Sequence, residues 1–298
     1  MSFFRFAFLC VLLAFSSVFA APKVVLFNDT SAWYHWGCTG TSTALKKGIQ
    51  DLGFEIEAIS IAQTKMFQEI PPFEEFDDSK KFEKFSQENK EIIETIRNAS
   101  AVVITGEGTL HDLRKGPQTL LYIAHISKKF LQKHVEIINH SAYPKDDQTL
   151  IGPFAEKGEE ELERANSIYK NVYDKLDFIA IREPISQRVM EEIGISSTLS
   201  FDCLPLYIRD HYSTKKCVES KTAVLSGSVA FSATGLENIC RYLEALSKEG
   251  YEIKVLIGAA AFPSEDDKLF VNFLRRHCKA PWKLIFASSM QEWLDTFF

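Results

Sequence analysis

Arg182 is the side chain best suited to bind an anion, and its place in the sequence is informative. It directly follows the apolar run Phe178–Ile181 and precedes Glu183. A planar guanidinium binds a carboxylate or a phosphate through two parallel hydrogen bonds. Ligands of open α/β sheets lie beyond the carboxyl ends of the strands, which is where this arginine would stand. We therefore predict that Arg182 binds an anionic ligand; an ion pair with Glu183 is the structural alternative.

The turn after Ala101–Thr105 combines two glycines with two ionisable side chains. Gly106 and Gly108 would let the backbone approach a ligand closely, and His111 and Asp112 follow them. Because a carboxylate at a strand end can act as a general acid or base, Asp112 is a candidate catalytic residue. The two glycines are candidate ligand contacts. The alternative is a strand–turn–helix junction that Asp112 caps.

A histidine and an aspartate follow two further apolar runs. His140 comes after the predicted strand Val135–Asn139, and Asp202 comes at the end of the run that starts at Thr198. Because imidazole titrates near neutral pH, we predict that His140 is a catalytic proton shuttle, against the alternative of a hydrogen-bonded loop histidine. Asp202 would either contact the ligand or cap the turn that follows it.

The segment between the first predicted strand and its helix is rich in aromatic, glycine and hydroxyl residues. Trp36 offers a flat ring that can stack on a sugar, and Gly37 leaves room for a ligand beside the backbone. Thr39 can cap a helix whose free amides face an anion. We predict that these three residues contact a sugar or order the loop, against a role in packing and capping alone. The spacing of the glycines matches neither the G-x-G-x-x-G nor the P-loop pattern, so no nucleotide site is predicted.

An alternation of apolar and amphipathic segments must position these side chains. Apolar runs predict buried strands at 23–27, 54–61, 101–105, 135–139, 178–181 and 198–201. Helical patterns fall between them, at 40–52, 79–98, 116–132, 157–176 and 185–193. Continuous apolar strands separated by helices predict an α/β fold with a parallel sheet covered on both faces.

A second series of the same kind follows a polar stretch at 209–221. It predicts strands at 223–226, 253–257 and 283–286, with helices at 235–248, 264–277 and from 290 onward. We therefore expect an N-terminal Rossmann-type domain at 21–210 and a partial C-terminal Rossmann-type domain at 222–298. The final residues lie inside an amphipathic pattern, which is why we expect the second domain to be incomplete.

Residues 1–20 have the form of a secretory signal peptide. Arg5 precedes the apolar run Ala7–Phe15, and small residues stand before a cleavage point after Ala20. This predicts a location in the secretory pathway or outside the cytoplasm. Because no later segment is apolar enough to cross a bilayer, we expect no transmembrane helix once the signal is removed.

Composition and cysteine spacing narrow the function classes. With 34 Lys and Arg against 40 Asp and Glu, the chain of 298 residues has a net charge of −6. A nucleic-acid binder that works through bulk positive charge is therefore excluded. Of the 6 cysteines, Cys10 lies in the predicted signal, and no pair among the others has C-x-x-C spacing. We predict no metal site; one disulfide is allowed, with no pairing assignable.

In their order along the chain, these segments resemble the polysaccharide pyruvyl transferase family. The likeness is carried by the first strand with its Asn/Trp-Gly loop, the glycine-rich turn that ends in Asp112, the R-[DE]-x-x-S…G pattern from Arg182 to Gly194, and Phe201–Asp202. It extends over the chain from Lys23 to Phe298, and Arg182–Gly194 is its most specific part.

The resemblance implies a glycosyltransferase-B-like architecture, in which two Rossmann-type domains flank the site. It implies transfer of the pyruvate unit of phosphoenolpyruvate to a glycan sugar as a ketal, without a cofactor. Arg182 would correspond to the donor-binding arginine of the family, and Asp112 to an acidic site residue. A trianionic donor needs fixed cationic groups, which agrees with the arginine.

The sequence departs from the family's pattern in two places. Many members have a Gly-Asp pair where this chain has Trp36-Gly37-Cys38, and the family's Arg-x-His element would lie just past 288–298. We therefore include a truncated copy in the expectation. Two other functions stay open: a nucleotide-sugar glycosyltransferase, because paired Rossmann domains also host that chemistry, and a non-catalytic secreted glycan-binding protein. The sequence does not predict the oligomeric state.

Overall fold

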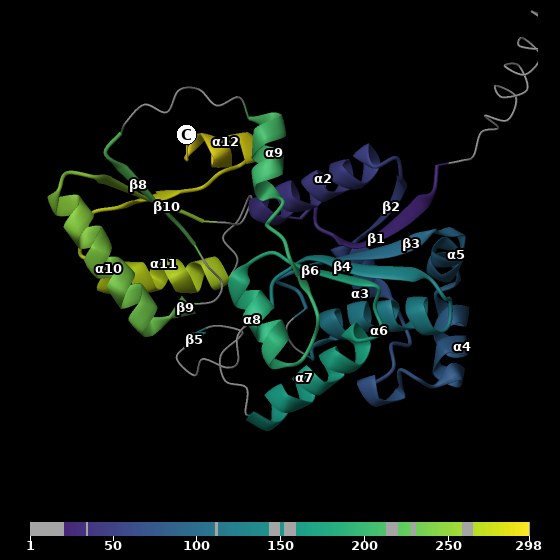
Figure 1. The fold of residues 1–298 in the computed structure, drawn as a ribbon. Coiled ribbons are helices and arrows are strands. Elements are labelled where there is room, and N and C mark those ends of the chain that lie inside the picture. The colour runs from purple at the N-terminus through teal and green to yellow at the C-terminus, as the bar shows by residue number, and fades with distance from the viewer. Residues whose placement is uncertain are drawn as a thin grey trace, which may run out of the picture.

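The computed structural model describes residues 21–33, 35–110, 113–142, 150–151, 159–212, 220–227, 231–257 and 265–297. The predicted signal at 1–20, the predicted site residue Asp112 and positions 213–219 of the polar stretch lie outside the described residues. The strands form two parallel sheets and one short antiparallel ladder (Figure 1). The expected α/β fold with parallel sheets is confirmed.

The larger sheet has six strands in the order β2-β1-β3-β4-β6-β7. Their bounds are Lys23–Asp29 (β1), Glu55–Ser60 (β2), Ala101–Glu107 (β3), His134–His140 (β4), Phe178–Ile181 (β6) and Thr198–Leu199 (β7). Neighbouring strands pair in parallel throughout. Their carboxyl ends therefore lie at one edge of the sheet.

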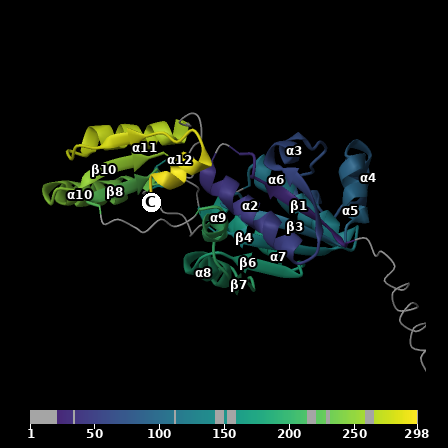
Figure 2. The same ribbon diagram turned by 90° about the horizontal axis from the view of Figure 1, so that it is seen from above.

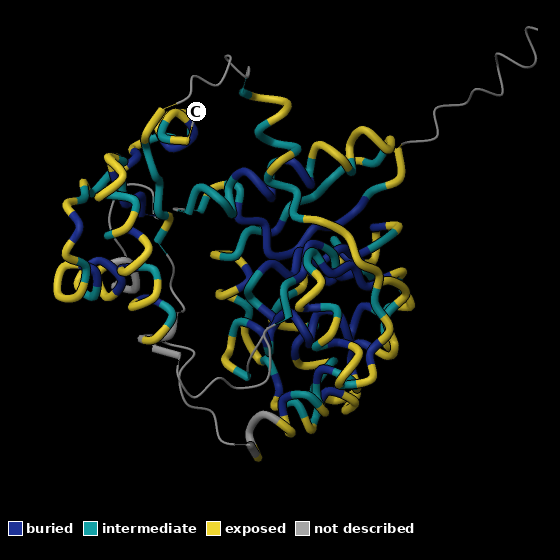
Figure 3. Tube along the Cα trace, turned by 60° about the vertical axis from the view of Figure 1, so that its left-hand side comes forward, coloured by how far each residue is buried: buried dark blue, intermediate teal, exposed yellow. Residues whose placement is uncertain are grey.

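Helices cover the larger sheet because its strands are apolar on both faces. The helices are Trp36–Asp51 (α2), Ile61–Met66 (α3), Ser79–Glu88 (α4), Lys90–Asn98 (α5), Lys115–Lys129 (α6), Glu159–Tyr173 (α7), Pro184–Glu192 (α8) and Leu204–His211 (α9), with a 3-10 turn at Phe73–Glu75. Val25 and Phe27 pack in a core with residues of α5, α6 and α7. Val24 and Leu26 pack on the other face, against Ile49 of α2. Buried residues consequently gather along these strands (Figure 3).

The smaller sheet has three strands in the order β11-β10-β8. Its elements are Thr222–Ser226 (β8), Ala233–Lys248 (α10), Glu252–Leu256 (β10), Glu265–His277 (α11), Lys283–Ile285 (β11) and Met290–Asp295 (α12). Leu236, Val255 and Leu274 join α10, β10 and α11 in one buried cluster. A two-residue strand Leu150–Ile151 (β5) pairs with Phe231–Ser232 (β9) in the antiparallel ladder.

The two sheets meet through helices. α12 packs through Trp293 and Leu294 in a cluster that contains Trp36 of α2 and Tyr207 of α9. The indole Nε1 of Trp36 donates a hydrogen bond to the Ala287 carbonyl at 3.2 Å. Figure 2 shows this contact region between the larger and the smaller sheet.

Three expected boundaries were wrong. The helix predicted from Gly40 begins at Trp36, because the first turns of α2 pack on α9 and α12; tertiary contact here outweighs the poor helix propensity of glycine and threonine. The helix predicted at 79–98 breaks at Asn89, whose side chain hydrogen-bonds the backbone of Gln68 and Phe85. The polar stretch predicted as a linker from 209 belongs to α9 up to His211.

In the described part of the chain, every helix is too short or too polar to serve as a membrane span.

Candidate functional site

Unusual backbone geometry marks the carboxyl edge of the larger sheet. Asn28, Glu107 and Asn139 have φ values of 63°, 39° and 51°. They lie at the ends of β1, β3 and β4, which are adjacent in the sheet. Non-glycine residues with positive φ are uncommon, and such conformations concentrate at functional sites. This edge is therefore the candidate site.

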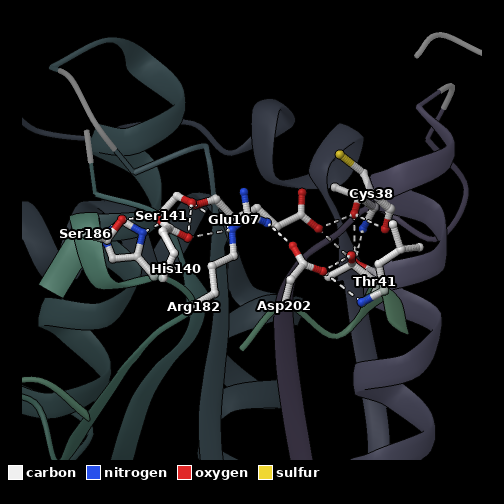
Figure 4. A network of polar contacts seen from close by, with 12 residues as sticks. Cys38, Thr41, Glu107, His140, Ser141, Arg182, Ser186 and Asp202 are labelled. Atoms are coloured by element: carbon white, nitrogen blue, oxygen red, sulfur yellow. Dashed lines mark hydrogen bonds and ion pairs between the residues drawn. The ribbon is translucent and has the colours of Figure 1, made fainter. Parts of the chain in front are cut away.

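Arg182 lies at this edge, directly after β6, as predicted from its position in the sequence. Its Nε donates to Ser141 Oγ at 2.7 Å, and its Nη1 donates to Asp202 Oδ2 at 2.8 Å (Figure 4). Glu183 Oε2 lies 3.4 Å from Nε. Among the described residues, none accepts a hydrogen bond from Nη2. The guanidinium is thus fixed on one side and keeps donors for a ligand on the other.

Two short chains of hydrogen bonds hold the partners of Arg182. Asp202 Oδ1 accepts from Thr41 Oγ1 at 3.1 Å and from the Leu204 amide at 2.8 Å, at the start of α9. Ser141 Oγ donates to Glu183 Oε2 at 3.0 Å. Asp202 therefore caps the turn, as one alternative predicted, and also orients Arg182; its contact with a ligand stays a prediction. The Arg182–Glu183 ion pair expected as an alternative is also present.

Glu107 is a buried carboxyl group in the same network. Only 5% of the residue is exposed, and Oε1 accepts hydrogen bonds from Thr30 Oγ1 at 2.7 Å and Ser42 Oγ at 3.4 Å. Burial raises the pKa of Glu107, whereas hydrogen bonds from Thr30 and Cys38 and the nearby Arg182 act in the opposite direction. Burial and the Glu107 charge raise the pKa of the Cys38 thiol well above its ordinary value. Cys38 Sγ also lies 3.9 Å from His35 Nδ1.

His140 is fully buried below this edge. Its Nε2 lies 3.2 Å from Tyr173 Oη and its Nδ1 lies 3.5 Å from the Glu107 carbonyl oxygen. A Cβ on Gly106 would stand 2.6 Å from His140 Cβ, so glycine permits the close approach of β3 and β4. A proton shuttle at His140 would have to act through its neighbours, since the ring has no exposed surface. That role, and ligand contact by Gly106, stay predictions.

Gly108 follows Glu107 in the turn, where the Thr109 amide donates to the Gly106 carbonyl at 2.9 Å. It is partly exposed beside the candidate site. Asp112, four positions further along the sequence, lies outside the described residues. Its predicted acid or base role stays a prediction.

The residues predicted as loop contacts lie in the first turn of α2. The hydroxyl of Thr39 donates to the backbone carbonyls of Trp33 and His35, at 3.1 and 3.2 Å, so it orders the entry to the helix. Trp36 packs between the sheets, as described above. A Cβ added at Gly37 would lie 3.6 and 3.8 Å from atoms of the His35 ring. One added at Gly40 would lie 2.6 Å from Leu204 and 2.7 Å from Met290, so Gly40 is the residue that their close approach requires.

The sequence did not reveal the part that several residues play in this hydrogen-bond network. From the sequence, Asp202 was assigned to a ligand contact or a turn cap, whereas Glu107 and Ser141 were assigned no role. Glu107, Ser141 and Asp202 share one signal, a polar side chain within two positions of a predicted strand end. Among the described residues, no three His, Cys, Asp or Glu side chains gather in a group that could hold a metal ion.

A comparison with models of protein families identifies the family to which the chain belongs. The model of the family described as polysaccharide pyruvyl transferase matches residues 42–297. The chain belongs to the polysaccharide pyruvyl transferase family. In this pyruvyl transferase family member, Glu107, Ser141, Arg182 and Asp202 all lie within the matched residues. A search of curated proteins finds no match for the chain.

Solved structures similar to this pyruvyl transferase family member have low sequence identity. An α-glucosyltransferase in complex with UDP and DNA aligns over 93% of this chain and 70% of its own, with 10% identity and a TM-score of 0.48. The S. aureus MnaA–UDP structure aligns over 93% and 72%, with 12% identity and a TM-score of 0.46. A UDP-GlcNAc 2-epimerase from Methanocaldococcus jannaschii aligns over 92% and 75%, with 13% identity and a TM-score of 0.39.

Proposed function

We propose that this chain transfers the pyruvate unit of phosphoenolpyruvate to two hydroxyl groups of a glycan sugar, forming a ketal. Membership of the polysaccharide pyruvyl transferase family supports the reaction class. The observation that carries the proposal is Arg182, whose Nη2 donates to none of the described residues at the carboxyl edge of the parallel sheet. A carboxylate or a phosphate matches these donors.

The surroundings of Arg182 support binding of an anion in a fixed orientation. Ser141 and Asp202 hold Nε and Nη1, so the arginine loses little rotamer freedom when the ligand binds. At the start of the nearby helix α2, the N-cap residue His35 makes no side-chain capping hydrogen bond. The amides of such a turn favour an anion. We propose that phosphoenolpyruvate contacts Arg182 and this turn, and that the acceptor sugar approaches from the side of Gly108.

The overall reaction consumes two sugar hydroxyl groups and releases inorganic phosphate. The two hydroxyl oxygens bond to C2 of phosphoenolpyruvate, and the bond from C2 to the phosphate oxygen breaks. One hydroxyl proton ends on C3, which becomes a methyl group, and the other ends on the phosphate. Glu107 is the proposed proton-exchanging group of the described residues, because it lies in the network of Arg182 and burial raises the pKa of its carboxyl group. Asp112 is retained as a second proposed acid or base.

Ligand binding by matched arginine variants tests this proposal. Arg182→Gln removes the guanidinium at the site, and Arg188→Gln removes one from the exposed face of α8. We expect Arg182→Gln to weaken phosphoenolpyruvate binding by about 1.5–3 kcal/mol, which is roughly 10- to 150-fold in Kd. Arg188→Gln should leave the Kd unchanged. Titration calorimetry at constant ionic strength gives both values, with UDP-glucose as the comparison ligand.

Transfer itself is measured by phosphate release in the presence of a panel of oligosaccharides. Release that depends on both phosphoenolpyruvate and one oligosaccharide, with a new ketal methyl signal in the proton NMR spectrum, supports the proposal. Equal phosphoenolpyruvate binding by Arg182→Gln and wild type would overturn the assignment of Arg182. Binding of UDP-glucose with no response to phosphoenolpyruvate would overturn the proposed reaction.

A further inference from the structure

Two cysteines of the smaller sheet lie together, far along the chain from the candidate site. Cys240 is on α10 and is 3% exposed, and Cys278 directly follows α11. Both pack with Ile239 and Trp282 in the apolar cluster of this sheet. Burial first, and the neighbouring Cys278 thiol next, raise the pKa of Cys240. In the structure, both cysteines carry free thiols.

Backbone contacts hold the two cysteines at this position. The Cys278 amide donates to the Leu274 carbonyl at 2.8 Å, which fixes it to the last turn of α11. The amide of the next residue, Lys279, donates to Glu244 Oε1 at 3.0 Å. Glu244 lies one helical turn after Cys240 on α10, so both residues face the same neighbour. The end of α11 is thus held against the face of α10 that carries Cys240.

We propose that Cys240 and Cys278 form a disulfide that joins α10 to the end of α11. No group of three metal-ligating side chains occurs among the described residues, so a metal site does not account for the pair. The described cysteines Cys38 and Cys203 belong to the candidate site and to the start of α9. The signal predicted at 1–20 would take the pair to an oxidising compartment, in which disulfides persist.

The oxidation needs a disulfide oxidant, such as oxidised glutathione. The partly exposed Cys278 sulfur attacks one glutathione sulfur and releases the other glutathione as a thiol. The Cys240 sulfur then attacks the mixed disulfide at Cys278 and releases the second glutathione thiol. The two protein protons and two electrons end on the two glutathione molecules. Burial raises the pKa of Cys240 to about 11, which agrees with Cys278 as the first attacking group.

Peptide mapping of the folded full-length chain tests the proposal. The reduced protein is incubated with oxidised glutathione, alkylated and digested without reductant. We expect a linked peptide pair that contains Cys240 and Cys278 and disappears after reduction. The Tm of the oxidised protein should exceed that of the reduced protein, because the crosslink restricts the unfolded chain.

Serine variants separate the crosslink from ordinary packing. Cys278→Ser should lose both the linked peptide and the reductant dependence of the Tm, and Cys203→Ser should keep both. Cys240→Ser should give the same two losses. Because Cys278 is partly exposed, Cys278→Ser keeps the test possible if the buried substitution Cys240→Ser prevents folding. Full alkylation of both thiols after oxidation, or a crosslink from either cysteine to Cys217, would overturn the proposal.

Discussion

Arg182 and Asp202 form an ion pair, with 2.8 Å between Nη1 and Oδ2, that connects the end of β6 to the start of α9. The second oxygen of Asp202 accepts hydrogen bonds from Thr41 of α2 and from the Leu204 amide. One carboxylate therefore orients the guanidinium and fixes two helices beside it.

We expect Asp202→Asn to lower the free energy of unfolding by about 1 kcal/mol, less than the roughly 1.5–3 kcal/mol of a hydrogen bond to a charged group, because solvent screens this partly exposed pair. Asp51→Asn, which removes a carboxylate of an exposed pair on α2, should change it by less than about 0.5 kcal/mol. Urea unfolding measures both. Equal effects of the two substitutions would mean that Asp202 has no special structural role.

Gly106→Ala tests the close approach of β3 and β4. The added Cβ would meet His140 Cβ, Cγ and Nδ1 at 2.6 to 2.7 Å, so we expect a loss of about 1–3 kcal/mol of stability. Gly116→Ala is the matched control, since a Cβ there meets nothing within 4 Å in the first turn of α6. It should gain up to about 1 kcal/mol through helix propensity. Thermal unfolding gives the Tm of both variants. A shift of both Tm values in the same direction would contradict the expected opposite effects.

Two buried tyrosines should respond oppositely to loss of their hydroxyl groups. Tyr173→Phe removes the partner of His140 Nε2, and we expect it to cost about 1–3 kcal/mol. Tyr122 Oη is buried and has no hydrogen-bond partner among the described residues. Tyr122→Phe should therefore be neutral or stabilise the fold by up to about 1 kcal/mol. Chemical denaturation distinguishes the two, and a larger loss for Tyr122→Phe would contradict the assignment.

The pH dependence of stability reports on Glu107. Burial raises its pKa above the ordinary value of 4.5, so the folded chain holds this proton more tightly than the unfolded chain. The corresponding stability is fully present below that ordinary value and is lost as pH rises through the pKa of the folded state. Relative to Glu107→Gln, the wild type should lose stability as the pH rises above that ordinary value, by at most about 1.4 kcal/mol per pH unit. Urea titrations of both proteins at each pH measure the difference, and a constant difference would mean that the pKa is not raised.

The central strands could be predicted from the sequence because their apolar residues are buried on both faces. The run at 101–105 lies within β3, the run at 135–139 within β4, and Phe178–Ile181 coincides with β6. The position of Arg182 follows directly from the end of that last strand. Parallel pairing then places its guanidinium at the edge where ligands of such sheets bind.

Contacts between distant segments account for what the sequence did not reveal. The start of α2 at Trp36 depends on packing against Tyr207 and Trp293, which no local pattern contains. The role of Glu107 depends on Thr30 and Ser42, which reach it only after β1 and β3 have paired. The assignment of paired Rossmann-type domains at 21–210 and 222–298 stays a prediction.

The packing of α12 on α2 and α9 limits how the two sheets can move relative to each other. Trp36 binds the Ala287 carbonyl on one side of this region, and Tyr212 donates to Asp295 Oδ1 at 2.9 Å on the other. A rotation that opened the space between the sheets would have to break both contacts or use them as its axis. Rotation about these contacts costs less free energy than breaking them, since it keeps the indole of Trp293 buried. α12 would then be the hinge about which the two sheets rotate.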